Sequence, residues 1–431
     1  MTSDKLNKLI DKEKINWIQL HFTDLIGRLR VIHIPSETYL KYHYEKGVGF
    51  DGSSVGLASV EKSDMIAVPD ESTFRKLPHE EDEACVISEI YNSSLKPFSA
   101  CPRQILKRAM STAKIQGFDD ITFSPELEFY VMNEHNKDRH EIIEQQGYLA
   151  PPSLDKAKDF RKTLSNLLIE SGYDVKYHHH EAGEYQHEIE IKPLNVLSAA
   201  DYCIYLKYLT REVAHINDLL VTFMPKPLSN DAGNGLHAHI KFLTNGKNMF
   251  YDENDKYNLS QTARYFIGGV LEHARGMAAI ANPTINSYKR LIPNFEAPIY
   301  VAWAAHNRSS LIRIPAKKNV DIEIRNSDPA ANPYLLFAAI IHSGLDGIKK
   351  KISYDPVEKN IYKMRENMKD LGIQKLPTNL NESLEELEKD DVIKRAIGKE
   401  ATDLFIQKKK AEWQLYIGET TDLEYRLYFH C

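Results

Sequence analysis

The sequence has few cysteines and no long apolar stretch, and both absences narrow the class of protein. Only four of its 431 residues are cysteine, and none forms a Cys-x-x-Cys pair. A disulfide framework and a thiolate metal site are therefore excluded. No apolar run approaches the roughly 20 residues that a membrane-spanning helix needs, and the first residues lack the apolar core of a secretory signal. We expect a cytoplasmic protein that does not bind membranes.

An excess of positive charge is also missing. The 55 Lys and Arg residues are outnumbered by 61 Asp and Glu residues, which gives a formal net charge of −6. Proteins that neutralise nucleic-acid phosphates are usually basic, so we expect no nucleic-acid partner. Hydrophobic residues make up 42% and charged residues 27%, as in ordinary globular proteins. The length predicts two or three domains.

The first hundred residues differ in pattern from the rest. Alternating segments around a turn at 23–27 predict a small hairpin-based domain over residues 1–100, ending in a linker at 93–102. The expected strands there are 15–22, 28–34, 64–69 and 84–90. Residues 101–431 alternate helices with short strands and form the second expected domain. Its expected helices run from Pro102 to Gly117, from a cap at Ser153 to Gly172, and over 197–218, 260–280, 331–351, 381–398 and 400–417.

Four short segments of the second domain each place two ionisable residues on one face of a strand. Because successive strand residues point to opposite faces, residues i and i+2 share a face. The four strands can therefore build one sheet with an apolar back and an ionisable front. The pairs are Glu126 with Glu128, Glu188 with Glu190, His237 with His239, and Glu323 with Arg325.

The composition of this front favours a metal site over the simpler alternative of a solvated sheet face. Antiparallel sheets commonly expose one polar face, but such a face is usually rich in Lys and Thr rather than Glu and His. Clustered carboxylates repel one another unless a cation lies among them. Carboxylate oxygens with one or two imidazoles suit Mg²⁺ or Mn²⁺ better than zinc. The number of glutamates makes two metal ions plausible.

A second group of residues is cationic. Arg290 and Glu296 lie toward opposite ends of a turn-rich loop, and Arg308, Arg313 and Arg325 follow it. Guanidinium groups commonly clamp carboxylate and phosphate oxygens. Each arginine alone is consistent with an ordinary surface residue. Together with a glutamate-rich metal site, however, the arginines indicate phosphoryl transfer. The phosphate loop GxxxxGK[ST] and a kinase-type glycine loop are both absent, so those two classes are excluded.

Ordered motifs along nearly the whole chain resemble those of one family. The N-terminal motifs are Phe22-Thr23-Asp24, Phe50-Asp51-Gly52-Ser53-Ser54 and Ser63-Asp64-Met65. The later ones are Pro125-Glu126-Leu127-Glu128-Phe129, Gly147-Tyr148, Glu181 to Glu188, Lys226-Pro227, Gly233 to His239, the loop 286–298, Asn307-Arg308-Ser309, and Glu323-x-Arg325. In this order and spacing the chain resembles glutamine synthetase of the bacterial and archaeal class I type.

The resemblance implies an α+β fold, with a small β-grasp domain followed by a catalytic domain whose curved antiparallel sheet is flanked by helices. It implies an ATP-dependent glutamate–ammonia ligase that forms glutamine through a γ-glutamyl phosphate intermediate. The implied partners are glutamate, ammonium and ATP, with two or more Mg²⁺ or Mn²⁺ ions in each subunit. The implied assembly is a dodecamer of two stacked hexameric rings.

The resemblance also implies a role for each metal- and glutamate-binding residue. One metal ion would be held by Glu128, Glu181 and Glu188, and the other by Glu126, His237 and Glu323. Arg290 and Arg325 would bind the carboxylates of glutamate, and the backbone of Gly233 would lie near its amine.

The remaining implied roles concern the nucleotide, the ammonium ion and the flap. His239, Arg308, Arg313 and Lys318 would face the nucleotide. Asp51, Ser54 and Tyr148 would form the ammonium site, with Asp51 and Ser54 supplied by a neighbouring subunit. Glu296 would lie on the flap over the reaction centre.

Some positions depart from the usual family pattern and leave substrate choice open. They are Glu184, Tyr185, Ala232, Lys241, Asn294 and Asp321. None of them removes an implied metal ligand. The alternatives are a γ-glutamyl–amine or polyamine ligase on the same scaffold, a non-catalytic relative, and a guanidino-kinase with a related catalytic fold. The group formed by Asp51, Ser54 and Tyr148 favours ammonium as the nucleophile.

Overall fold

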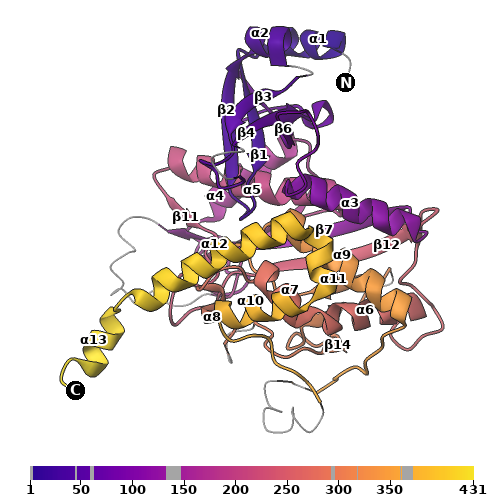
Figure 1. Ribbon diagram of the computed structural model, residues 1–431. Helices are drawn as coiled ribbons and strands as arrows, with labels where there is room; N and C mark the ends of the chain where they lie inside the picture. The colour runs from indigo at the N-terminus through magenta and orange to yellow at the C-terminus, as the bar shows by residue number, and fades with distance from the viewer. Residues whose placement is uncertain are drawn as a thin grey trace.

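The computed structural model describes residues 3–43, 46–58, 63–132, 147–292, 297–317, 319–359, 361 and 372–431. Within them the chain forms two β-sheets, a smaller one near the N-terminus and a larger one flanked by helices (Figure 1). This is the α+β arrangement that the sequence predicts. The domain boundary between residues 100 and 101 stays a prediction. In support of it, the small sheet's last strand ends at Asn92 and the next helix begins at Pro102.

The small sheet has the strand order β2-β1-β6-β4-β3, with β5 beside β6. The expected hairpin is present, because β1 pairs with β2 antiparallel, while β1 and β6 run parallel. Helix α1 packs on this sheet through Leu6 and Ile10, which lie one turn apart and join a buried cluster with Ile18 and Leu20 of β1. The elements are α1 (Ser3–Glu13), β1 (Trp17–Thr23), β2 (Leu29–Pro35), α2 (Ser36–Thr38), η1 (Tyr39–His43), β3 (Val48–Asp51), β4 (Asp64–Pro69), η3 (Glu71–Thr73), β5 (Arg75–Lys76) and β6 (Glu83–Asn92).

Strand β1 is buried on both faces because its second face rests on the larger domain. Gln19 and His21 are both buried although they are polar. The Tyr208 hydroxyl donates to Gln19 Oε1 at 3.3 Å. The same tyrosine ring meets the His21 ring edge-on, with centroids 5.0 Å apart. The polar residues of this strand therefore form a domain contact and not a solvated face.

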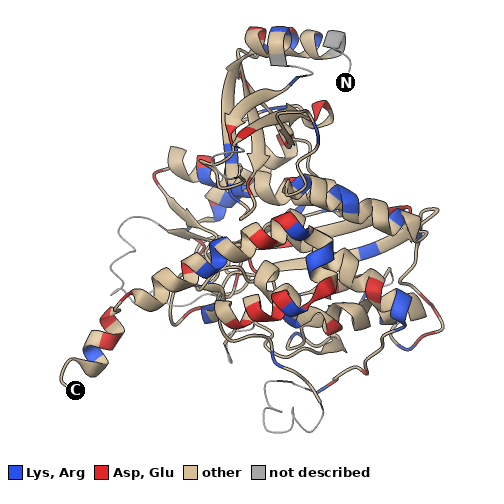
Figure 2. Cartoon of the chain, viewed as in Figure 1, with Lys and Arg blue, Asp and Glu red and all other residues tan. Residues whose placement is uncertain are grey.

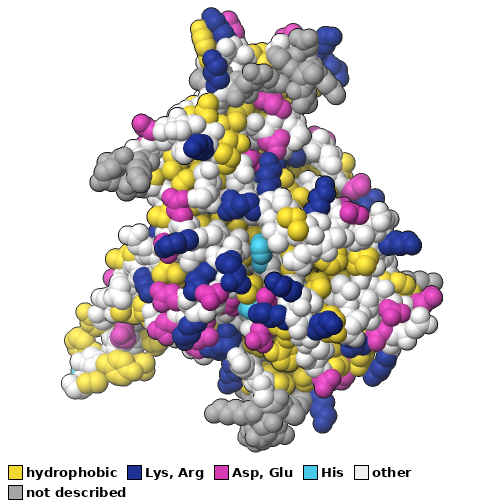
Figure 3. All heavy atoms as spheres, turned by 45° about the vertical axis from the view of Figure 1, so that its right-hand side comes forward, with side chains coloured by type: hydrophobic (Ala, Val, Ile, Leu, Met, Phe, Trp, Pro, Cys, Tyr) yellow, Lys and Arg dark blue, Asp and Glu magenta, His cyan; other side chains and the backbone are white. Residues whose placement is uncertain are grey.

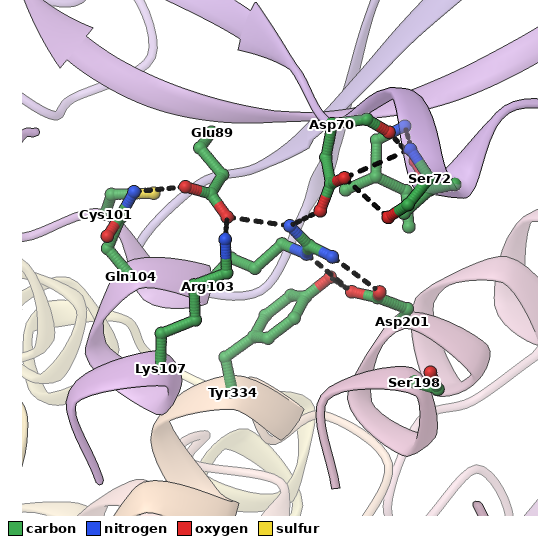
Figure 4. A network of polar contacts seen from close by, with 12 residues as sticks. Asp70, Ser72, Glu89, Cys101, Arg103, Gln104, Lys107, Ser198, Asp201 and Tyr334 are labelled. Carbon is green, nitrogen blue, oxygen red and sulfur yellow. Dashed lines mark hydrogen bonds and ion pairs between the residues drawn. The ribbon is translucent and has the colours of Figure 1, made fainter. Parts of the chain in front are cut away.

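Arg103 joins the two domains through carboxylates of both (Figure 4). Its Nη1 atom donates to Asp70 and to Glu89 at 2.7 Å each, and both acids belong to the small domain. Its Nε and Nη2 atoms donate to Asp201 at 3.0 and 3.1 Å, and the Tyr334 hydroxyl donates to the same carboxylate at 2.7 Å. Arg103, Glu89 and Asp201 are buried. The charges therefore compensate one another away from water.

The four predicted site strands lie side by side in the large sheet. The sheet order is β14-β15-β16-β12-β7-β9-β8, with β10 and β11 beside β7 and β13 beside β12. The neighbours β16, β12, β7 and β9 pair antiparallel, as expected, whereas β14 and β15 run parallel, so the sheet is mixed. Its strands are β7 (Asp120–Met132), β8 (Val175–His180), β9 (Gln186–Ile191), β10 (Leu194–Asn195), β11 (Leu220–Thr222), β12 (Leu236–Thr244), β13 (Lys247–Asn248), β14 (Trp303–Ala305), β15 (Ile312–Ile314) and β16 (Ile322–Ile324).

Helices pack on the large sheet and cover its apolar side (Figure 1). Phe337 of α9 packs on Phe123 of β7, with ring centroids 4.4 Å apart. Among the described residues, no helix is both long and apolar enough to cross a membrane. The helices are α3 (Pro102–Ile115), α4 (Lys158–Glu170), α5 (Val196–Ile216), α6 (Gln261–Glu272), α7 (Ala274–Ala281), α8 (Ser287–Arg290), α9 (Pro333–Lys350), α10 (Leu380–Lys389), α11 (Asp391–Ile397), α12 (Lys399–Gly418) and α13 (Asp422–Tyr428).

Two expected helices are each broken into two, and one begins later than expected. His273 separates α6 from α7, and its ring meets Asp390 Oδ2 at 2.8 Å. Asp390 in turn separates α10 from α11, because its carboxylate accepts from the first backbone N–H groups of α11. The cap predicted at Ser153 is wrong, since α4 begins at Lys158. The preceding turn is held instead by Asp155, whose carboxylate accepts from Arg161 Nη1 at 3.0 Å.

Charged residues of both signs are distributed over the outer helices and loops (Figure 2). On the face shown in Figure 3, Lys and Arg side chains alternate with Asp and Glu side chains, with apolar atoms between them. This mixture agrees with the small net charge of the chain and differs from the basic stripe of a nucleic-acid-binding protein.

Candidate active site and metal centre

The strand register places the predicted ionisable residues in one row across the sheet. Glu128 of β7 lies opposite Glu188 of β9. On the other side of β7, Glu126 lies opposite His237 of β12. His239, two residues further along β12, lies opposite Glu323 of β16. The predicted ionisable front is therefore confirmed as a property of four adjacent strands.

This row is buried, so the alternative of a solvated sheet face is wrong. Glu323 is 2% exposed, Glu188 3% and Glu128 8%. A surface sheet face would leave such side chains in water, whereas here they lie together inside the protein. The opposite face is mainly apolar, as predicted, apart from the buried His187, which lies opposite Phe129. Its buried residues include Leu127, Phe129, Ile189, Ile191, Ala238, Ile240, Ile322 and Ile324.

Glu126 lies between the two histidines of β12. Its Oε1 atom is 2.8 Å from His239 Nε2, and its Oε2 atom is 3.4 Å from His237 Nδ1. Burial opposes ionisation of Glu126, but the two imidazoles hold its pKa well below the usual range. Burial would likewise lower the pKa of His239, but Glu126, Asp321 and Glu323 raise it to about 10. Without a bound metal ion His239 is therefore cationic at neutral pH, and it must lose its proton to act as a metal ligand.

The structure brings together part of each predicted metal set and adds other residues. Ligand atoms of Glu126, His239 and Glu323 lie within 4.8 Å of one another, so His239 joins the set in which the sequence placed His237. A second group comprises His179, Glu181 and Glu188, and a third comprises Glu126, Glu188 and Glu190. His179 is not among the predicted ligands, although its position two residues before Glu181 gives the same i, i+2 signal.

Glu128 is present in the row but its carboxylate is engaged by hydrogen bonds. Its Oε2 atom accepts from Gln186 Nε2 and from the backbone N–H of Gly235, each at 2.7 Å. Burial, together with the charge of Glu181, raises the pKa of Glu128. The Gln186 amide also donates to the Gly233 carbonyl at 3.1 Å, which ties this carboxylate to the loop before β12.

The donor set fits divalent cations. Burial and the neighbouring charges of Glu126, Glu128, Glu181 and Glu190 raise the pKa of Glu188 well above its usual range. Several carboxylates that repel one another in a buried space, with imidazoles beside them, are the oxygen-rich environment that Mg²⁺ and Mn²⁺ prefer.

Arginines border the row at Glu323. Arg313 Nη1 lies 2.5 Å from Glu323 Oε2, and Arg325 Nε lies 3.1 Å from Oε1. Arg325 also donates to the Arg308 carbonyl. The buried Arg290 donates to the Arg325 and Asn326 carbonyls at 3.2 and 2.9 Å. Arg313 and Arg325 thus contact the row at Glu323, and Arg290 is joined to Arg325 through a backbone carbonyl.

Two glycines allow the loop before β12 to approach these side chains. A Cβ atom on Gly233 would lie 2.6 Å from the Pro225 carbonyl oxygen and 2.8 Å from Cγ of Arg290. A Cβ atom on Gly235 would lie 2.8 Å from His237 Nε2 and 2.9 Å from Nη2 of Arg290. Gly235 is part of the family motif from Gly233 to His239, but only the structure shows that the lack of a side chain at Gly235 permits this close packing.

The predicted ammonium residues are not assembled within one chain. The Asp51 carboxylate accepts from the Ser53 hydroxyl at 2.7 Å and from the Ser54 hydroxyl, so it caps its own turn. These hydrogen bonds, of which the one from Ser54 has the largest effect, lower the pKa of Asp51 to about 2. Tyr148 is 55% exposed, and its ring centroid lies 5.3 Å from that of His179, one of the candidate metal ligands.

Other predicted residues lie near the row or outside the described chain. Asp321 accepts from Lys317 Nζ at 3.1 Å and faces His239 Nδ1 at 3.2 Å. The Ala232 carbonyl accepts from the Tyr130 hydroxyl at 2.6 Å. Glu296, Lys318 and Asn294 lie outside the described residues.

These features define a two-domain α+β protein with a buried face of glutamates, histidines and arginines. The family profile described as "Glutamine synthetase, beta-Grasp domain" matches residues 14–93, and "Glutamine synthetase, catalytic domain" matches residues 99–428. The chain belongs to the glutamine synthetase family, as the motifs predicted.

Similar proteins cover almost the whole chain. A glutamine synthetase of Thermotoga maritima is 39% identical over 440 aligned residues, which span 100% of both chains. A glutamine synthetase of Pyrococcus furiosus is 43% identical over 94% of this chain and 91% of its own. Among solved structures, a GmaS complex with ADP has a TM-score of 0.91 at 28% identity, covering 98% of this chain and 99% of the other. The Plasmodium falciparum glutamine synthetase has a TM-score of 0.90 at 26% identity, covering 99% of each chain.

Proposed function

We propose that this protein is an ATP-dependent glutamate–ammonia ligase, which forms glutamine through a γ-glutamyl phosphate intermediate. The observation that carries the proposal is the buried Glu–His–Arg row, in a chain that matches glutamine synthetases along its full length. A carboxylate is a poor electrophile, so amide formation needs activation. Phosphorylation of the side-chain carboxylate of glutamate by ATP provides a leaving group, which ammonia then displaces as inorganic phosphate.

The carboxylate row supplies the candidate ligands for two or more divalent ions. We assign one ion to Glu128, Glu181 and Glu188, with His179 as an additional candidate, because these ligand groups face one another across β7, β9 and β8. We assign the other ion to Glu126, Glu323 and His237. His239 lies on the same strand as His237, and its ring is close to the carboxylates of Glu126 and Glu323. Bound Mg²⁺ or Mn²⁺ supplies charge screening between the reacting carboxylate and the ATP phosphates.

The arginines are the proposed clamps for the anionic substrates. Arg290 and Arg325 are buried and held by backbone carbonyls and by Glu323, so their guanidinium groups are fixed before substrate binds. We assign them to the carboxylates of glutamate, with the Gly233 backbone near its amine. Arg308, Arg313, Lys318 and His239 are assigned to the nucleotide, and the similarity to a GmaS bound to ADP supports a nucleotide site in this fold.

Asp51, Ser54 and Tyr148 are the proposed ammonium site, completed across a subunit boundary. Asp51 is charged at neutral pH and can pair with ammonium. Its low pKa makes it a weak base while it is exposed, but burial beneath another subunit would raise that pKa and favour proton transfer. Glu296 is assigned to a loop that closes over the intermediate and excludes water.

The assembly that we propose is a dodecamer of two hexameric rings. It explains why Asp51 and Ser54 are exposed in one chain, far in sequence from the carboxylate row. An inactive mixture of Asp51→Ala and Glu323→Ala subunits should regain activity after dissociation and reassembly. If mixed oligomers form and no activity returns, the site is not shared between subunits.

The reaction itself is tested by its stoichiometry. With Mg²⁺, ATP, glutamate and ammonium, we expect one glutamine, one ADP and one phosphate per turnover. ATP hydrolysis without glutamine, or glutamine formation without ADP, would contradict the proposal.

A further inference from the structure

A cavity of about 570 Å³ lies where the two domains meet helix α12, and none of the roles above uses it. Its wall contains the turn after β1, part of α5, β11 and the segment after it, and α12. Figure 1 shows α5, β11 and α12 on the same side of the molecule, below the small sheet. The volume lies within the range of small-molecule sites, about 300–1,000 Å³.

Positive charge dominates the lining. It contains Arg28, Lys207, Arg211 and Lys409, with Glu412 as the only acid in that lining. Lys409 Nζ pairs with this carboxylate at 2.7 Å, so the acid is already matched. Figure 2 shows Lys and Arg on both α5 and α12. Three cations therefore remain without compensation from the lining itself.

Within the described part of the chain, the hydrogen bonds of Lys207 and Arg211 go to neutral groups, and Arg211 Nη1 donates to the Lys207 carbonyl at 3.4 Å. Lys207 is 7% exposed, and its ammonium group donates to the carbonyl oxygen of Pro329, which is a neutral acceptor. Burial lowers the pKa of Lys207 to about 8 although the neighbouring Asp328 acts to raise it, so this carboxyl group compensates the ammonium group only in part. Asp24, on the same turn as Arg28, is engaged by Arg30 at 2.8 Å.

The cavity also has an apolar part. The Arg211 guanidinium lies over the Phe223 ring, 5.4 Å from its centroid, which leaves the edges of the guanidinium plane for other acceptors. Leu29, Ile204 and Val221 line the same space. Convergent cations beside apolar walls suit a compact organic molecule with negative charge at its ends.

We propose that this cavity binds a small anion with two negative charges, a dicarboxylate or inorganic phosphate, at a site separate from the carboxylate row. Arg28, Lys207 and Arg211 are the residues that recognise it. Pro329 and Thr284 also line the cavity. The first lies shortly after Arg325 in the chain and the second shortly before Arg290.

The test uses the full-length protein and two anions, succinate and inorganic phosphate, in calorimetric titrations without ATP. Arg211→Met removes an exposed cavity cation and should weaken binding about tenfold or more, the equivalent of one charge-assisted contact. Lys192→Met removes an exposed cation that does not line the cavity and pairs with Asp174. This control should leave both Kd values unchanged. Arg28→Met gives an independent second variant from the other domain.

The two anions distinguish a dicarboxylate ligand from inorganic phosphate. Weaker succinate binding in both cavity variants supports a dicarboxylate ligand, and an effect confined to phosphate supports inorganic phosphate. Equal Kd values in wild type, Arg211→Met and Arg28→Met would overturn the proposal, as would failure of the wild type to bind either anion. A change in oligomer mass with no change in Kd would also overturn it, because the cavity would then be an interface between copies of the chain.

Discussion

The Nε2 atom of His239 lies 2.8 Å from Oε1 of Glu126, and this contact balances one end of a row of buried carboxylates. Burial would lower the pKa of His239, but Glu126, Asp321 and Glu323 raise it to about 10, so the two side chains form an ion pair when no metal ion is bound. At the other end Glu188 is surrounded by carboxylates, and its pKa is raised well above the usual range. The protein thus concentrates unfavourable charge at the position assigned to a metal ion.

Glu188→Gln should make the metal-free protein more stable and the enzyme inactive. Removing a buried charge among like charges is expected to raise the free energy of unfolding by about 1–2 kcal/mol. Loss of a metal ligand should lower kcat at least about 100-fold. Glu170→Gln, on the exposed surface of α4, is the control. Thermal unfolding in EDTA and assays in Mg²⁺ provide the two readouts, and reduced stability together with normal activity would contradict the assignment.

Gly235→Ala should reduce activity with little change in global stability. The new methyl group would lie 2.8 Å from His237 Nε2 and 2.9 Å from Arg290 Nη2, so both side chains must move. Displacements of this size at a catalytic centre cost about 100-fold in rate. Gly418→Ala is a matched control, because a Cβ atom there meets nothing within 4 Å. Equal kcat/KM in the two variants would show that the close approach has no catalytic role.

Arg103→Met should destabilise the junction between the domains. The substitution leaves Glu89 and Asp201 buried with less compensation, and breaking a buried ion pair in this way costs about 3–5 kcal/mol. Urea unfolding should show a lower midpoint, or an additional transition if the small domain separates first. Arg108→Met, at an exposed arginine that donates to the Ser99 carbonyl at 2.8 Å, should change the midpoint little. An unchanged urea midpoint for Arg103→Met would show that this network does not stabilise the domain junction.

His273 should make stability depend on pH. Burial would lower its pKa, but Asp390 and Asp346 contact its two ring nitrogens and raise it above the usual 6.5. A raised pKa in the folded state gives stabilisation that is complete below about pH 6.5 and is lost as pH rises through the folded-state value. The difference in Tm between wild type and His273→Gln should therefore be largest near pH 6 and shrink toward pH 9. A difference that grows with pH would show that the imidazole is neutral in the folded protein.

The site strands could be predicted from the sequence because alternation and residue type point to the same face. Glu126, His237 and Glu323 each lie in a segment whose intervening residues are apolar, and burial of those residues fixes which way the charged ones face. The order of the strands in the sheet is not contained in this local pattern. The strands are far apart in the sequence, and only the family motifs implied one site.

The missed features depend on contacts between distant residues. Helix breaks at His273 and Asp390 follow from a hydrogen bond between them across 117 positions of sequence. Strand β3 alternates over only four residues, Val48 to Asp51, which is too short to predict a strand without its pairing with β4. His179 lies in a run of three histidines, where the sequence does not show which one faces Glu181. The cavity lined by Arg28 and Lys207 joins both domains and is invisible in either segment alone.

The choice of nucleophile tests the central claim most directly. We expect kcat/KM for ammonium to exceed the values for methylamine, ethanolamine and putrescine, measured as γ-glutamyl product with ATP and Mg²⁺. A larger amine would leave polar groups of the Asp51, Ser54 and Tyr148 site unpaired, at about 1–3 kcal/mol for each buried group. Each such loss corresponds to a preference for ammonium of about tenfold or more. A value for putrescine or ethanolamine equal to or above that for ammonium would contradict the assignment and make this protein a γ-glutamyl–amine ligase.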